Sequence, residues 1–322
     1  MTMKRLPFIF ASLIGLISCA PALAQTWPTA PVTLVVGFAP GGSTDIAARV
    51  LAEQLGKKLG QSVVVVNRPG ASGVVGANSV AISKPDGQTF LFGSGSLASG
   101  PSLNKSLPYD ASQDFVPVTQ ITSIASILAV HPSLPAKSVK EFVDYVKANP
   151  GKINYGSAGA GSLQHVSGAL FEKAIGARMV HVPYAGGAPA NTDLVAGRVQ
   201  AVFGPIVELA GFHKAGSIRV LGVTSTKRSS AMADVPLIAD TVPGYDIGTW
   251  HGLFAPKGTP VAIVEAMSKA MAAALSETAV RNRLVDLGLE PVGSSSQEFS
   301  AFFQSEIRRW RELVQISGAT PN

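Results

Sequence analysis

Glycine and hydroxyl residues gather where predicted strands end, and there they could bind an anion through neutral hydrogen-bond donors. The clearest case is Phe38–Asp45, which follows the apolar run Val32–Val36 and precedes the helical periodicity of Ile46–Leu59, with Ser43 or Thr44 as helix cap. In such a strand–turn–helix unit, backbone N–H groups converge and the helix N-terminus adds about half a positive charge. The pattern favours a carboxylate guest. A tight turn that binds nothing is the alternative, since every α/β fold needs such turns.

The same composition returns after further predicted strands. These loops are Asn67–Gly73, Gly93–Ser96, Gly156–Ser162 and Tyr184–Pro189. Open α/β sheets bind their ligands at the carboxyl ends of the strands. We therefore expect loops of this kind to carry the binding site.

Strand–helix alternation positions these loops and falls into two series. We predict no helix between the strand Thr89–Phe92 and the extended stretch that begins at Asp114. The two series predict two α/β domains that face each other across a cleft. Domain 1 is expected to comprise residues 25–124 and 247–322, and domain 2 residues 125–246, with crossings near 118–130 and 247–256.

Motifs for catalysis are lacking, so we predict that the chain is not an enzyme and uses no cofactor. No Ser has the G-x-S-x-G spacing of a nucleophile elbow, and no P-loop motif occurs. The stretch Gly93–Ala98 loosely fits a dinucleotide-binding pattern, but Pro101 interrupts the helix that must follow.

Metal and nucleic-acid binding are also not expected. The five histidines show no ligand spacing, and Cys19 is the only cysteine. The formal net charge is +6, yet Lys and Arg are scattered without a basic run, which argues against a nucleic-acid surface.

The N-terminus resembles a secretory signal peptide over residues 1–24. Lys4 and Arg5 precede the apolar run Phe8–Ile17, and Ala22–Ala24 offers small residues for cleavage. This predicts export to the periplasm. A lipobox-like alternative would leave a lipidated Cys19 as the first residue.

Longer motifs resemble one family over nearly the whole mature chain. They include WPTAPVTLVVGFAPGGSTDIAARVLAEQL (27–55), SVVVVNRPGASGVVGANSVAISKPDGQTFLFG (62–93), NYGSAGAGSLQHVSGALFEKAIG (154–176) and MVHVPYAGGAPANTDLVAGRVQAVF (179–203). The chain is similar to the substrate-binding proteins of tripartite tricarboxylate transporters, the Bug family. The resemblance implies a type II periplasmic binding protein fold, with mixed sheets flanked by helices and a ligand cleft between two domains.

The resemblance also implies partners. A monomeric protein of this family would capture a small aliphatic or aromatic carboxylate and deliver it to a membrane permease with a large and a small subunit. An alternative is a periplasmic adaptor that presents the same ligand to a sensor kinase.

Matching positions give the site residues that the resemblance implies. They are Phe38, Pro40, Gly41, Gly42, Thr44, Asp45, Asn67, Ser94 and Ser96 in domain 1, and Ser157, Gly161, Ser162, His165, Tyr184, Gly187, Ala188 and Asp193 in domain 2. Three of these roles stay open. Asp45 could instead brace its loop, His165 could make a structural hydrogen bond, and Tyr184 could simply pack at a strand end.

One position departs from the family pattern. The family often has an Asp-Asn pair after the strand that ends at Phe203, where this chain has Gly204 and Pro205. An acceptor for an ammonium or hydroxyl group is therefore expected to be missing. This predicts a ligand without an amine.

Overall fold

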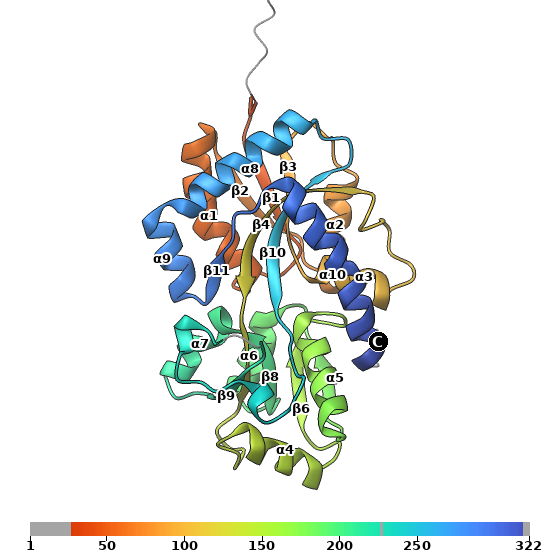
Figure 1. Ribbon diagram of the computed structural model, residues 1–322, viewed down its shortest axis with the longest axis vertical. Coiled ribbons are helices and arrows are strands. Elements are labelled where there is room, and N and C mark those ends of the chain that lie inside the picture. Colours follow the sequence, from red (N-terminus) through yellow and green to blue (C-terminus); the bar gives the residue numbers. More distant parts are fainter. Residues whose placement is uncertain (1–26, 226–227, 318–322) are drawn as a thin grey trace, which may run out of the picture.

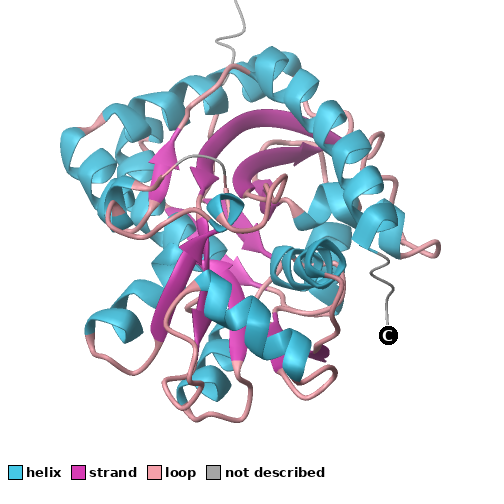
Figure 2. Cartoon of the chain, turned by 60° about the horizontal axis from the view of Figure 1, so that its bottom comes forward, coloured by secondary structure: helices cyan, strands magenta, loops and turns pink. Residues whose placement is uncertain are grey.

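The chain forms two halves that stack end to end, each a mixed β-sheet flanked by helices (Figures 1 and 2). The computed structural model describes residues 27–225 and 228–317. The predicted signal peptide and Cys19 lie outside the described residues.

The first half holds a six-stranded sheet in the order β11-β4-β10-β3-β1-β2. Its strands are β1 (Val32–Val36), β2 (Val63–Asn67), β3 (Thr89–Ser94), β4 (Phe115–Ile124), β10 (Thr249–Pro256) and β11 (Leu289–Pro291). Strand β1 runs parallel to β2 and β3, whereas β10 is antiparallel to β3 and β4. The carboxyl ends of β1 and β3 therefore meet at one edge of the sheet.

Helices cover both faces of this sheet, which explains its continuous apolar strands. They are α1 (Ser43–Leu59), α2 (Val74–Ala81), α3 (Ser96–Leu103), α8 (Val261–Ser276), α9 (Thr278–Asp286) and α10 (Ser296–Ser317), with a 3₁₀ turn at Ala71–Gly73. On α1, Ala47, Leu51 and Leu55 recur every four residues and are fully buried. Burying each leucine contributes about 1.5–3 kcal/mol, and this packing fixes where the N-terminus of α1 lies.

The second half holds a five-stranded sheet in the order β7-β6-β8-β5-β9. Its strands are β5 (Ser126–Val130), β6 (Asn154–Ser157), β7 (Val180–Pro183), β8 (Ala201–Pro205) and β9 (Arg219–Val223). Its helices are α4 (Val139–Ala148), α5 (Leu163–Ile175), α6 (Gly187–Val195) and α7 (Ile206–Lys214), with 3₁₀ turns at Ser230–Met232 and Ile238–Asp240. Strand β6 runs parallel to β7 and β8, so their carboxyl ends also share an edge.

The chain passes from one sheet to the other after β4 and again before β10. Strand β4 ends at Ile124 in the first sheet, and β5 begins at Ser126 in the second. The chain returns to the first sheet with β10, which begins at Thr249. The exact domain boundaries given above stay a prediction.

Helix α3 corrects the prediction that no helix follows the third strand. It contains Pro101, whose missing N–H removes one intrahelical hydrogen bond. The helix forms because Leu97, Ala98 and Leu103 are buried and α3 packs against α10. Tertiary packing has here outweighed an unfavourable local residue.

The C-terminal helix α10 spans both halves (Figure 1). It packs against α3 and β4 of the first half and against α5 of the second. Glu306 on this helix is buried, and its carboxylate accepts hydrogen bonds from Trp250 Nε1 at 2.7 Å and Trp310 Nε1 at 3.2 Å. The bond from Trp250 ties α10 to strand β10, and the bond from Trp310 lies within the helix.

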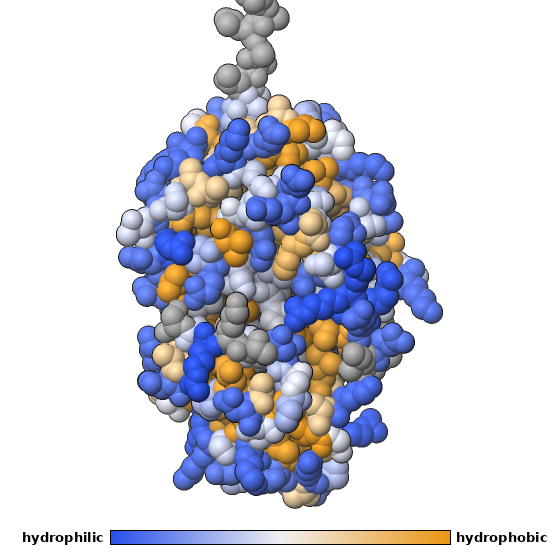
Figure 3. Space-filling model, in the orientation of Figure 1, coloured by the Kyte–Doolittle hydropathy of each residue, from blue (hydrophilic) through white to orange (hydrophobic). Residues whose placement is uncertain are grey.

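Apolar side chains lie mainly inside the two halves. The face in Figure 3 mixes hydrophilic and hydrophobic residues. Large exposed apolar residues lie on separate parts of the chain, such as Ile82 directly after α2 and Val261 at the start of α8. In the described part of the chain, no helix is long and apolar enough to cross a membrane.

Candidate functional site

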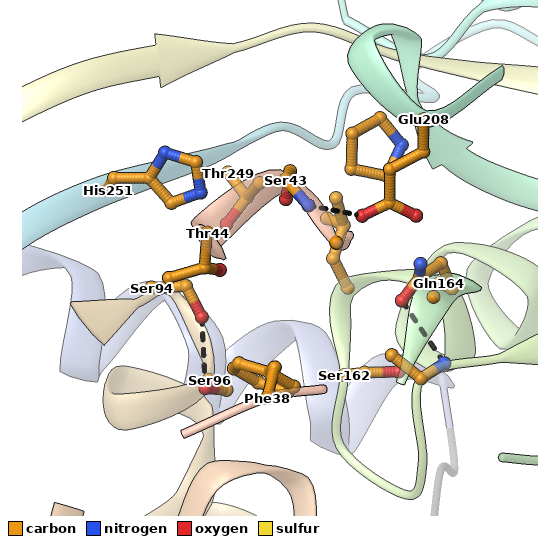
Figure 4. A pocket seen from close by; sticks show the side chains of 15 residues that line it. Phe38, Ser43, Thr44, Ser94, Ser96, Ser162, Gln164, Glu208, Thr249 and His251 are labelled. Carbon is orange, nitrogen blue, oxygen red and sulfur yellow. Dashed lines mark hydrogen bonds between the residues drawn. The ribbon is translucent and has the colours of Figure 1, made fainter. Parts of the chain in front are cut away.

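A cavity of about 50 Å³ lies between the two halves, and we call it the central cavity (Figure 4). The first half lines it with the β1–α1 turn, the β3–α3 turn and β10, and the second half with the β6–α5 loop and the starts of α6 and α7. The lining residues are Phe38, Gly42, Ser43, Thr44, Ser94, Ser96, Ala158, Ser162, Leu163, Gln164, Gly187, Pro205, Glu208, Thr249 and His251. Loops at strand ends thus converge on one space between the halves.

Direct hydrogen bonds join the halves around this cavity. Ser72 Oγ donates to the carbonyl oxygen of Ala160 at 2.6 Å, and Ser99 Oγ donates to that of Gly161 at 2.7 Å. These four residues line a groove beside the central cavity, where the two halves are in direct contact.

The N-terminus of α1 receives its cap from the opposite half. We predicted Ser43 or Thr44 as the cap, but Gly42 holds that position and no side chain of the turn caps the helix. Instead, Ser43 N donates to Glu208 Oε1 at 2.8 Å. A carboxylate on a helix N-terminus is electrostatically favourable, which explains why the turn needs no local cap.

Asp45 holds the β1–α1 turn together. Its carboxylate accepts hydrogen bonds from Gly41 N at 3.0 Å, Asn67 Nδ2 at 2.9 Å and Arg49 Nε at 3.0 Å. Asn67 Nδ2 also donates to the carbonyl of Phe38 at 3.0 Å. Burial alone would raise the pKa of Asp45, yet the hydrogen bonds from Arg49, Gly41 and Asn67 lower it below the ordinary value. Asp45 is therefore an ionised brace of the turn.

The β3–α3 turn supplies hydroxyl groups to the first-half wall. Ser94 Oγ and Ser96 Oγ lie 3.1 Å apart and share a hydrogen bond. Ser96 is the first residue of α3, so its backbone N–H lies at a helix N-terminus. The aromatic ring of Phe38 lies beside them in Figure 4.

The β6–α5 loop forms the facing wall. Ser162 is the N-cap of α5, and its side chain accepts a hydrogen bond from His165 N at 3.4 Å. Gln164 Oε1 accepts from Ala158 N at 3.2 Å, which fixes the preceding loop. Both Ser162 and Gln164 line the central cavity.

His165 lies behind this loop and stacks on His181, with ring centroids 3.9 Å apart. His165 Nδ1 accepts a hydrogen bond from Gly161 N at 3.0 Å, and His181 Nε2 shares one with Ser157 Oγ at 2.6 Å. Burial lowers the pKa of His165 to about 4, and burial together with His165 lowers the pKa of His181 to about 4. The pair is therefore neutral near pH 7 and supports the loop from behind.

Glu208 corrects the expectation that the second-half wall lacks an acceptor. Gly204 and Pro205 do replace the Asp-Asn pair, but α7 begins directly after them and brings the Glu208 carboxylate into the cavity wall. Asn191 Nδ2 donates to its Oε2 at 3.0 Å. Burial raises the pKa of Glu208, an effect that the hydrogen bonds from Ser43 and Asn191 oppose.

His251 on β10 adds a polar group that the sequence did not single out. It is fully buried, and its Nδ1 shares a hydrogen bond with Thr122 Oγ1 at 3.1 Å. Its Nε2 has no hydrogen-bond partner among the described residues, and Figure 4 shows this nitrogen directed toward the other lining side chains. Burial lowers the pKa of His251 to about 3, so the ring is neutral at pH 7.

Tyr184 and Asp193 form a separate cluster. Tyr184 Oη donates to Asp193 Oδ2 at 2.7 Å, and Arg198 pairs with Asp193 Oδ1 at 2.6 Å. Tyr184 lines a second groove of about 380 Å³, which also includes Ser96 and Gly161. This groove lies next to the central cavity and shares Ser96 with it.

The predicted site residues therefore divide into groups. Those that line the central cavity are Phe38, Gly42, Thr44, Ser94, Ser96, Ser162 and Gly187. Gly161 and Tyr184 line the adjacent groove. Those outside both linings are Pro40, Gly41, Asp45, Asn67, Ser157, His165, Ala188 and Asp193.

Several lining residues were not predicted. They are Ser43, Ala158, Leu163, Gln164, Pro205, Glu208, Thr249 and His251. Ser43, Ala158, Leu163 and Gln164 lie within or next to the predicted loops, and their neighbours were a usable signal. Glu208 and His251 carried no local signal, because only tertiary structure brings α7 and β10 to the cavity.

The arrangement suits binding more than bond-breaking chemistry. Hydroxyl groups, helix N-termini and a neutral imidazole surround a small cavity, and its lining contains no Lys or Arg among the residues described. Within residues 27–225 and 228–317, no three His, Cys, Asp or Glu side chains lie close enough to hold a metal ion.

Comparisons with known proteins match nearly the whole chain. The model of the tripartite tricarboxylate transporter family receptor matches residues 47–319. Protein BugT of Bordetella pertussis is 36% identical over 314 residues, which cover 97% of this chain and 96% of BugT.

Solved structures give the same picture. An R. palustris protein with adipate is 37% identical and has a TM-score of 0.89. The match covers 92% of this chain and 100% of that protein's chain. MatC from Rhodopseudomonas palustris with bound malate is 34% identical and has a TM-score of 0.85. The match covers 89% of this chain and 100% of the MatC chain. The predicted two-domain binding-protein fold is confirmed.

Proposed function

The chain belongs to the tripartite tricarboxylate transporter receptor family, and we propose that it captures a small carboxylate between its two halves in the periplasm. Receptors of this family bind a substrate and do not convert it, so the prediction that the chain is not an enzyme is confirmed. The ligand class, the location and the delivery step are the proposal.

The observation that carries the proposal is the composition of the central cavity. Thr44, Ser94, Ser96 and Thr249 bring hydroxyl groups from the first half, and Ser162 brings one from the second. Neutral donors of this kind bind carboxylate oxygens without a buried basic side chain, and the N-termini of the adjoining helices favour negative charge.

The solved relatives support the same ligand class. One holds adipate and the other malate, and both ligands are aliphatic dicarboxylates. The small volume of the central cavity, about 50 Å³, favours a compact carboxylate group as the part of the ligand that lies in it.

Closure of the two halves supplies the mechanism. The central cavity exists only where both halves meet, and contacts such as Ser72 with Ala160 lie beside it. A ligand that touches both walls binds the closed form better than the open form. It therefore shifts the population toward closure.

Delivery to a membrane permease follows from the family, and location in the periplasm agrees with the predicted signal peptide at residues 1–24. Uptake assays test this step. A deletion strain should lose uptake of the ligand and regain it with the wild-type gene. Normal uptake in the deletion strain would contradict the delivery role.

Ligand capture is tested on the purified chain, residues 25–322, by thermal shift and calorimetry. The panel holds di- and tricarboxylates, aromatic carboxylates, amino acids and neutral sugars. A ligand at 100 times its Kd adds about 2.7 kcal/mol to the free energy of unfolding, which raises Tm by a few degrees. Stabilisation by neutral sugars alone would contradict the proposal.

Matched variants then locate the site. Ser96→Ala and Ser162→Ala each remove one hydroxyl from the cavity and should cost about 1 kcal/mol of binding free energy, or roughly a five-fold loss of affinity. Ser305→Ala removes an exposed hydroxyl on α10 and serves as the control. Equal affinity in all three variants would refute this placement of the ligand.

A further inference from the structure

Glu208 places a carboxylate on the position that a ligand carboxylate would otherwise prefer. Its Oε1 accepts a hydrogen bond from Ser43 N, the first N–H of α1, at 2.8 Å. Its Oε2 accepts one from Asn191 on α6 at 3.0 Å, and a methyl group on Gly187, the first residue of α6, would overlap it. The Glu208 carboxylate thus lies on the N-terminus of α1 and against the first residue of α6, so it contacts a helix from each half.

This placement divides the central cavity into two chemically different ends. At the Glu208 end, a carboxyl group already occupies the N-terminus of α1, and a ligand carboxylate beside it would be disfavoured because two carboxyl groups that share a site do not both ionise readily. The remaining lone pairs of Glu208 can accept hydrogen bonds, because a carboxylate offers about four acceptor positions.

The opposite wall offers groups that can bind a carboxylate. The hydroxyls of Ser94 and Thr44 lie there, and so does His251, whose Nε2 is buried without a partner among the residues described. In the tautomer in which His251 Nδ1 accepts from Thr122 Oγ1, Nε2 carries the proton and can donate to a carboxylate oxygen. In Figure 4, His251 and Ser94 lie across the cavity from Glu208. A buried polar atom that faces a cavity indicates that a partner belongs in the cavity.

We propose that Glu208 is a specificity-determining residue that selects carboxylates bearing a hydrogen-bond donor, a hydroxyl or an ammonium group, directed at its end of the cavity. The ligand carboxylate binds at the opposite end. The ligand class is therefore a hydroxy- or amino-carboxylate. This inference rests on the proposed function and narrows it, and it replaces the sequence-based expectation of a ligand without an amine.

Calorimetry with three matched ligand sets tests the inference on purified residues 25–322. The sets are succinate, malate and aspartate; propionate, lactate and alanine; and phenylpropionate, phenyllactate and phenylalanine. Within each set the members differ at one carbon, which carries hydrogen, hydroxyl or ammonium. In the set that binds, the wild-type protein should prefer a donor-bearing member over the plain acid at least ten-fold, equivalent to about 1.4 kcal/mol.

Substitutions of Glu208 separate a role in ligand specificity from a role that is only to hold the two halves together. Glu208→Gln keeps an acceptor but no charge, so it should lower the preference for the ammonium member and retain part of that for the hydroxyl member. Glu208→Met keeps the length without an acceptor and should abolish both preferences. Asp144→Asn removes an exposed carboxylate on α4 of the same half, far from the cavity lining, and should leave the ratios unchanged.

The outcomes discriminate clearly. If the wild-type protein binds the plain acids as tightly as the donor-bearing members, the inference is overturned while the proposed function stands. This result comes from the wild-type protein alone and does not depend on whether a variant folds. If Glu208→Gln and Glu208→Met weaken all members equally, Glu208 only holds the halves together and the inference fails. If no member of the three sets binds but adipate does, the inference is overturned while the proposed function stands. If no carboxylate of the sets or of the thermal-shift panel binds, both fail.

Discussion

Replacement of Asp45 by Asn should destabilise the fold more than a typical surface change. The Asp45 side chain is buried and accepts hydrogen bonds from Gly41, Arg49 and Asn67. An amide keeps one acceptor oxygen but turns an NH₂ group toward one of these donors. Losing a charge-assisted bond to a buried donor costs about 1.5–3 kcal/mol. Because the Arg49 side chain is 53% exposed, its ion pair with Asp45 contributes at most about 1 kcal/mol to the free energy of unfolding.

The total for Asp45→Asn is therefore about 2–3 kcal/mol of unfolding free energy, or a fall in Tm of about 4–6 °C. Thermal unfolding followed by circular dichroism at pH 7 measures it. Because the folded-state pKa of Asp45 lies below the ordinary 3.8, its contribution is present above that pH. This contribution is lost as the pH falls through the folded-state pKa. The difference in Tm between the wild-type protein and Asp45→Asn should therefore become smaller in that range.

Asp193→Asn provides the matched control for this experiment. Asp193 also pairs with an arginine, Arg198, and accepts a hydrogen bond from Tyr184, but this cluster is more exposed to solvent. Its replacement should lower Tm less than Asp45→Asn does. Unchanged Tm in Asp45→Asn together with a lost ligand affinity would refute the bracing role and indicate direct ligand contact.

Two further predictions concern the second half. Gly187→Ala should displace the Glu208 carboxylate and weaken ligand binding in calorimetry. The control Gly211→Ala has open space around the added methyl group, so it should leave the affinity unchanged and the fold equally or slightly more stable. Equal affinities in both variants would contradict this packing. Because the folded-state pKa values of His165 and His181 are about 4, below the ordinary 6.5, stability should be full above pH 6.5 and fall on the order of 3 kcal/mol per histidine toward pH 4. His165→Gln should make the fall of Tm with pH less steep, while His181 and His251 account for the remainder, and an equally steep fall in this variant would exclude His165 as a source.

The fold was predictable because local signals agreed with the tertiary structure. Apolar runs such as Val32–Val36 form buried strands, and glycine-rich turns follow them as expected. The missed helix α3 shows the limit of this reasoning. A proline in the sequence lowers local helix propensity, but contacts with α10, nearly 200 residues later in the chain, outweigh it.

The candidate site was predictable where one loop supplies several groups. Ser94, Ser96 and Ser162 lie at strand ends, and the rule for open α/β sheets located them. Glu208 was missed because it lies in an ordinary helix whose role depends on contact with the other half. His251 was missed because a histidine in a strand has no spacing that distinguishes a cavity residue from a core residue.

Helix α10 has a consequence for how the two halves separate. It is tied to β10 by Glu306 and also packs against α5 of the second half. Separation by a simple pull would have to break this apolar contact, whereas rotation about an axis near α10 would preserve most of it. The protein should therefore open by a hinge motion about the α10 side. The two halves should separate most on the side away from that helix.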